Sequence, residues 1–225
     1  MIQNDPSILK SSNEFMDYVD VKEKSSPYQL IYKQIYEYAK EKGIKTETMF
    51  DVEMALKTGQ LSLSDKLFKL LEENIDDIVL KQIFINLLIL DGKKKGKIAE
   101  IVVNEFKKYF SHSSFSDEED GYLWYLGDAL YRLSVKKFYC DYISIVNHKE
   151  FGRARQMVVL LLKKFPFDET ISVLLKQLDD HDINGHILET LSKFDFKNRS
   201  VIAETFVSDE RKWVAKIATR MLQGL

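Results

Sequence analysis

Few residues in this chain bend or cross-link the backbone. The 225 residues include only 3 prolines, 9 glycines and one cysteine. Scarce proline and glycine argue against a strand-rich fold with many tight turns and favour helices joined by short connections. The single Cys140 can form neither an intramolecular disulfide nor a structural zinc site. Because it lies in an apolar helical stretch, we expect its thiol to be buried.

An excess of one charge is also missing. The chain has 33 Lys and Arg against 35 Asp and Glu, a net charge of −2. Nucleic-acid-binding domains commonly carry a basic excess, so the overall charge does not favour that class. The N-terminus lacks the basic start and apolar run of a secretory signal, and no long uncharged apolar stretch occurs. We therefore expect no membrane span and a cytoplasmic protein.

Helical periodicity is the dominant pattern that the sequence does contain. Residues 1–27 are polar and irregular, and from residue 28 onward apolar residues recur at helical spacing. We predict an all-α protein of about 10–12 helices. The Ser-rich, acidic segment 111–120 predicts a long loop. It would separate irregular helical repeats over 28–110 from a regular C-terminal part, 121–225.

An internal repeat of 29 residues runs through the C-terminal part. Shifting the chain by this distance aligns two sets of residues: Leu133, Leu162 and Leu191, and Phe138, Phe167 and Phe196. After a one-residue slip, a further half-copy covers residues 213–221. Each copy predicts two helices, neither of which can bury its apolar stripe alone. We expect the stacked copies to bury the leucines in one core and the phenylalanines in the turns.

Four segments carry a resemblance to a known family: 123–133 (LWYLGDALYRL), 150–165 (EFGRARQMVVLLLKKF), 178–194 and 211–222. They resemble HEAT repeats, in particular the HEAT-repeat domain of bacterial proteins. The resemblance implies a right-handed α–α superhelix, a HEAT/ARM-like solenoid that is continuous over 121–225 and binds partners without chemistry of its own. HEAT repeats commonly place an arginine early in one helix of each pair. Arg155 fits that position, whereas Asn184 occupies it in the next copy, so the series of arginines is interrupted.

The candidate partner-binding site consists of residues near the starts of the helices that we expect to line the concave side of the stack: Trp124, Asp128, Arg153, Arg155, Gln156, Asp180 and His186. Two interpretations remain open. Arg and Trp are enriched at binding hot spots, which favours a concave patch that anchors a partner. Alternatively, an Asp–Arg brace joins adjacent repeats and Trp124 belongs to the core.

No motif for catalysis, metal or cofactor binding stands out. His181 and His186 are five residues apart and share no helix face, so we expect no metal site. Gly-rich phosphate loops and nucleophile elbows are missing from the sequence. The lysines at 93–95 and 97 follow a turn signal and fit a solvated loop better than a phosphate site. We expect no cofactor.

The sequence therefore predicts a non-enzymatic scaffold that binds a macromolecule, with a protein as the favoured partner, through its concave face. The family resemblance suggests an inhibitor role, such as that of a toxin-immunity protein. The alternative is a nucleic-acid-binding protein similar to the HEAT-like DNA glycosylases. Those enzymes need a basic concave surface and an aromatic or acidic reader of the damaged base, which Trp124, Asp128, Arg153 and Arg155 could supply. A HEAT-based enzyme or lyase is a third hypothesis.

Overall fold

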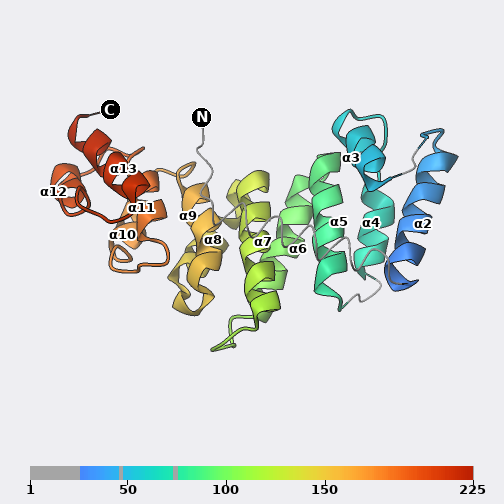
Figure 1. Cartoon of the computed structure of the whole chain (residues 1–225), viewed down its shortest axis with the longest axis horizontal. Helices are drawn as coiled ribbons and strands as arrows, with labels where there is room; N and C mark the ends of the chain where they lie inside the picture. The colour runs from blue at the N-terminus through green and yellow to red at the C-terminus, as the bar shows by residue number, and fades with distance from the viewer. Residues whose placement is uncertain (1–25, 46–47, 73–75, 225) are drawn as a thin grey trace. The chain divides into compact units, whose positions relative to one another are not determined.

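The protein is helical wherever its structure is described. A computed structural model describes residues 26–45, 48–72 and 76–224. These residues form twelve α-helices and two short 3-10 helices and contain no strand, so the all-α prediction is confirmed (Figure 1). The predicted irregular segment 1–27 lies outside the described residues, except that the first described helix already begins at Ser26.

The chain divides into two compact units, residues 1–93 and 94–225. The first contains α2 (Ser26–Glu41), α3 (Met49–Lys57), α4 (Ser64–Glu72) and α5 (Ile78–Asp91). Helices α3 and α4 both pack on α5, which is apolar around most of its circumference and forms the core of this unit. The Asp77 carboxylate caps α5 by accepting the backbone N–H of Val79 and Leu80.

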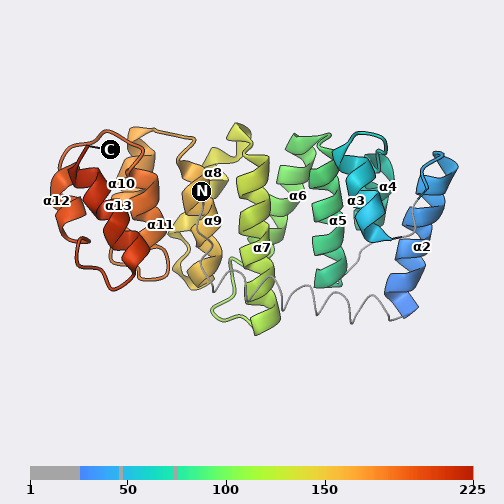
Figure 2. The same ribbon diagram turned by 45° about the horizontal axis from the view of Figure 1, so that its top comes forward.

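The second unit contains eight described α-helices: α6 (Lys95–Lys108), α7 (Asp117–Leu133), α8 (Tyr139–Asn147), α9 (Gln156–Leu162), α10 (Asp168–Leu175), α11 (Asn184–Leu191), α12 (Arg199–Glu204) and α13 (Lys212–Leu222). The 3-10 helices η1 (Lys136–Phe138) and η2 (Lys149–Arg155) precede α8 and α9. Helix α7 packs on α9, α9 on α11 and α11 on α13 (Figure 2). We call these four the inner helices. Each of α6, α8, α10 and α12 packs against the inner helix that follows it.

The aligned leucines occupy equivalent positions in this unit. Leu133, Leu162 and Leu191 are the last residues of α7, α9 and α11, and all three are buried. Since α7, α9 and α11 each end on a buried leucine and contact the next inner helix, the 29-residue repeat corresponds to a repeated packing unit.

The aligned phenylalanines behave differently from the prediction. Phe138 is buried, but Phe167 is exposed and packs edge-on against the Tyr139 ring, with centroids 5.0 Å apart. In the second and third copies a phenylalanine two residues nearer the helix end takes the buried position: Phe165 and Phe194. The expectation that the aligned residues fill each turn is therefore wrong for the second copy.

The Ser-rich segment is shorter as a loop than predicted. The Ser116 hydroxyl accepts the backbone N–H of Glu119, and the Glu119 carboxylate accepts the backbone N–H of Ser116. This capping box makes residues 117–120 the first turn of α7. Because α6 packs against α7, the segment is a connection inside the second unit.

Cys140 corrects a further expectation. Its side chain is exposed. The buried residues of α8 are Tyr142, Ile145 and Val146, which share the opposite side of the helix. The apolar sequence around Cys140 therefore identified the helix correctly but not the face on which the thiol lies.

Candidate interaction surface

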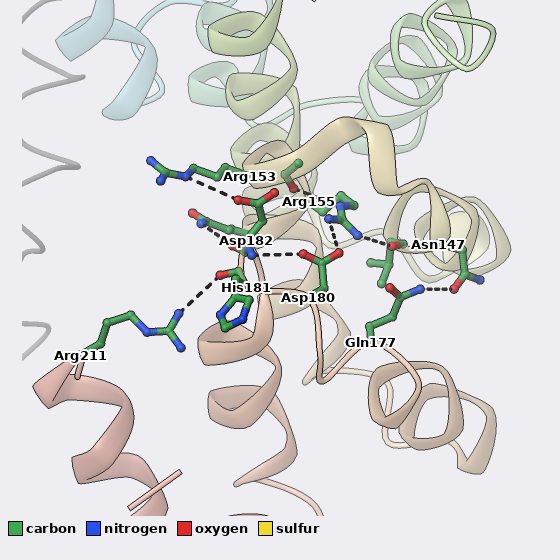
Figure 3. Close-up of polar contacts among 11 residues, drawn as sticks. Asn147, Arg153, Arg155, Gln177, Asp180, His181, Asp182 and Arg211 are labelled. Atoms are coloured by element: carbon green, nitrogen blue, oxygen red, sulfur yellow. Dashed lines mark hydrogen bonds and ion pairs between the residues drawn. The ribbon is translucent and has the colours of Figure 1, made fainter. Parts of the chain in front are cut away.

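Arg153, Asp182 and Arg211 are spaced by 29 residues and lie just before α9, α11 and α13, whereas Trp124, 29 residues before Arg153, lies in the middle of α7. Arg153 and Asp182 are both well exposed, and the Arg153 Nε lies 3.8 Å from the Asp182 Oδ1 (Figure 3). One repeat further on, the Arg211 Nη1 donates to the backbone carbonyl of His181 at 3.5 Å. The repeat thus places polar side chains in series along one end of the inner helices.

Arg155 is a buried brace. Its side chain is 1% exposed, and its Nη2 lies 2.7 Å from the Asp180 Oδ2. The same guanidinium donates to the carbonyl oxygens of Gly152 at 3.0 Å and Val146 at 3.3 Å (Figure 3). It therefore ties the end of α8 and η2 to the connection before α11. Arg155 therefore fits the interpretation as a brace between repeats and not that of a partner-binding residue, because it is too buried to contact a partner.

Of the two candidate aspartates, Asp180 is the acceptor of that brace and Asp128 is not. Asp128 faces Arg132 on its own helix, with 3.9 Å between the carboxylate and guanidinium. Helical spacing of four residues explains this pairing, because such residues are neighbours on the helix surface. Asp128 and Arg155 consequently belong to different parts of the unit's polar network.

The interrupted series of arginines is completed by Arg211. Asn184 occupies the position equivalent to Arg155, and Asp209 the position equivalent to Asp180. Arg211 Nη2 donates to the Asn184 Oδ1 at 2.8 Å and to the Asp209 Oδ2 at 2.7 Å. The hydrogen bonds from Arg211 hold the pKa of Asp209 below its usual value. A guanidinium from a different position thus supplies the charge that Asn184 lacks.

The remaining candidate residues are partly exposed. Trp124, Asp128, Gln156 and His186 are half-buried, and Arg153 is 75% exposed. The Gln156 Nε2 donates to the backbone carbonyl of Asp182 at 2.8 Å, and the His186 ring lies 5.3 Å from the Trp213 ring. We define the α7–α11 surface by these five partly exposed residues: Trp124, Asp128, Arg153, Gln156 and His186.

Asp120, Asp182 and Arg211 are polar residues near this surface that the sequence analysis did not select. Asp120, Trp124 and Asp128 are spaced by four residues and share one face of α7. Burial raises the pKa of both Asp120 and Asp128, although Arg153 and Arg132 respectively oppose the shift. The 29-residue spacing from Trp124 through Arg153 was the sequence signal that could have identified Asp182 and Arg211.

Over residues 26–45, 48–72 and 76–224, no three His, Cys, Asp or Glu side chains converge as metal ligands. Within the same ranges, every helix is too short or too polar to cross a bilayer. No protein-family model, curated protein or solved structure matches the chain.

Proposed function

We propose that the chain is a HEAT-like α-solenoid that binds a protein partner through the α7–α11 surface and has no catalytic role. The partial exposure of Trp124, Asp128, Arg153, Gln156 and His186 carries this proposal, because it brings an indole, an imidazole, an amide and charges of both signs to the surface. The serial contacts of the inner helices support a superhelical arrangement. An inhibitory, toxin-immunity role is a narrower form of the same proposal and rests on the family resemblance alone.

The chemistry of the surface favours a protein over a nucleic acid. An indole and a guanidinium that are both accessible are typical anchors of protein interfaces. Asp120, Asp128 and Asp182 lie on or beside the surface and would repel phosphates. Arg155, one of four residues on which the nucleic-acid alternative depends, is buried against Asp180.

Site-specific photocrosslinking tests the proposal. A photoreactive phenylalanine analogue would replace Gln156 on the surface or, as a matched control, the exposed Ser172 on α10. In cells that naturally produce the chain, we expect a discrete crosslinked polypeptide from position 156 and not from position 172. The charge reversal Arg153→Glu, at an exposed position, should abolish that crosslink while leaving the thermal unfolding curve nearly unchanged.

Three outcomes would contradict the proposal. Identical crosslinks from both positions would indicate non-specific capture, and no crosslink from position 156 would mean that the surface is unoccupied. Binding of labelled duplex DNA at low salt that Arg153→Glu abolishes would support the nucleic-acid alternative.

A further inference from the structure

Helix α13 carries a row of three cationic residues on its outer face. Val214, Ala218 and Met221 are buried in a core shared with Leu188 of α11 and Ala203 of α12. Lys212, Lys216 and Arg220 are spaced by four residues, so they lie on the opposite side of the helix. All three are exposed and span about 12 Å at 1.5 Å per residue. We call them the α13 basic row.

Within the described residues, no side chain neutralises this row. Lys212, Lys216 and Arg220 form no hydrogen bond or ion pair there, and α13 contains no Asp or Glu. The two carboxylates nearest in sequence lie just before the helix. Asp209 is held by Arg211 through two side-chain hydrogen bonds, and Glu210 acts electrostatically on the same Arg211. The charge of the row is therefore available to a partner.

The row also reduces the stability of its own helix. Like charges four residues apart repel, each pair costing a few tenths of a kcal/mol, while the opposite effects of Lys212 in the first turn and Arg220 in the last turn on the helix dipole offset one another. Surface helices commonly alternate acidic and basic residues at this spacing, as Lys33 and Glu37 do on α2. Repulsion within the row lowers the stability of α13, and no contact in the described part of the chain compensates for it. Such a loss is expected where a surface has a binding role.

One exposed apolar side chain on the same helix, that of Trp213, borders the row, whereas Leu222 is two residues after Arg220 and lies on another side of the helix. Trp213 is 36% exposed and Leu222 is 39% exposed. An acidic segment that also carries apolar residues could use both features, since it would pair with the row and cover the indole. The apolar stripe of α13 is already buried, so the helix cannot insert that stripe into a membrane surface. Three cations would also release few counterions from a nucleic acid.

We propose that the outer face of α13 is a docking site for an acidic, partly apolar segment of another protein. The α13 basic row pairs with carboxylates spaced by one helical turn, and Trp213 contacts an apolar side chain beside them. The three charged residues of the row are not among those of the α7–α11 surface and can be altered without changing it, whereas Trp213 contacts His186 of that surface and is kept unaltered.

A defined peptide tests the assignment. The probe is a fluorescein-labelled helical peptide of about three turns with Glu at every fourth position and Leu beside them. Its binding to the full chain is measured by fluorescence anisotropy at low salt. The variant is Lys212→Glu/Lys216→Glu/Arg220→Glu. The matched control is Lys176→Glu/Lys193→Glu/Lys197→Glu, which makes the same change in net charge at exposed lysines of the same unit.

We expect the α13 variant to raise the Kd at least about tenfold, because three exposed ion pairs are lost and replaced by repulsion, and the control to change it little. In a Trp124→Phe background, peptide binding should also shift the fluorescence of Trp213. Both triple variants should keep the helical circular-dichroism spectrum.

Several results would overturn the proposal. Absence of peptide binding to the unaltered chain would do so, as would equal weakening by the two variants, which would indicate a general charge effect. Tighter binding of duplex DNA or of phosphatidylglycerol vesicles, lost in the α13 variant, would assign the row to a phosphate-bearing partner instead.

Discussion

At the scale of single residues, the second unit joins neighbouring repeats by buried or half-buried arginines. Arg155 satisfies two backbone carbonyl groups and one carboxylate from three different segments. Breaking such a group is costly because its partners stay buried without it, even where the intact pair adds little net stability. The residue therefore acts on the geometry of the inner helices rather than on a partner.

Replacement of Arg155 by alanine should destabilise the fold strongly. Arg155→Ala leaves the Asp180 carboxylate and two carbonyl oxygens without their donor, and we expect a loss of about 3–5 kcal/mol in the free energy of unfolding. Arg153→Ala is the control, because that side chain is 75% exposed and its ion pair is long, and it should cost less than about 1 kcal/mol. Urea unfolding followed by circular dichroism measures both. Equal losses in the two variants would rule out the brace.

Asp128 should lower stability at neutral pH. Burial raises its pKa in the folded protein, so the folded state disfavours the carboxylate above the unfolded pKa of about 3.9. Asp128→Asn is therefore expected to stabilise the protein at pH 7 by a few tenths of a kcal/mol, with no gain near pH 3, where both states are protonated. Urea midpoints at the two pH values measure the difference.

Asp117→Asn provides a control of opposite sign. Asp117 is exposed in the first turn of α7, where a negative charge favours the helix dipole, so this change should reduce stability slightly at pH 7. If Asp128→Asn also reduced stability at pH 7, the desolvation of Asp128 would be contradicted. A destabilising carboxylate on the α7–α11 surface is consistent with a role in binding.

At the scale of elements, close approach of α13 to α11 depends on Gly185. A Cβ atom added at this position would lie 2.5 Å from the Trp213 Cη2 and 2.9 Å from a methyl group of Val214. The indole therefore lies directly on the backbone of α11, beside His186. A side chain here would have to displace the start of α13.

Gly185→Ala should consequently destabilise the α11–α13 contact by about 1–3 kcal/mol and expose Trp213. In a Trp124→Phe background, its emission should shift to longer wavelength. Gly121→Ala is the matched control, because Gly121 lies in α7 with nothing within 4 Å of the added Cβ, and it should stabilise by about 0.5–1 kcal/mol. Stabilisation by both changes would show that the contact can open without cost.

At the scale of the second unit, stability depends on a core that passes from one inner helix to the next. Leu162 is fully buried at the end of α9, between α7 and α11. Leu162→Asp should unfold this unit, since an unpaired buried carboxylate costs roughly several kcal/mol. Leu222→Asp, at a 39% exposed leucine, should leave the unit folded. Hydrogen exchange resolved by peptide separates α6–α13 from α2–α5 and would reveal unfolding confined to one of them.

The helices and the repeat could be predicted because they depend on local periodicity. Leu133, Leu162 and Leu191 recur at one spacing, and each is a buried residue at the end of a helix. The placement of Phe165 rather than Phe167 in the core could not be predicted, because it depends on the length of the turn after α9. Likewise, the sequence suggested an arginine at the brace, but the choice of Asp180 as its acceptor depends on the path of the chain before α11.

Arg155 and Arg211 each join two neighbouring repeats, and these two junctions differ in the order of the arginine and its acceptors along the chain. In the Arg155 junction, the arginine precedes its acceptor Asp180 in the sequence. In the Arg211 junction, the acceptors Asn184 and Asp209 both precede the arginine. During synthesis on the ribosome, domains tend to form from the N-terminal end. The first junction can therefore close as soon as its acid emerges, whereas the next stays open until residue 211 has left the exit tunnel.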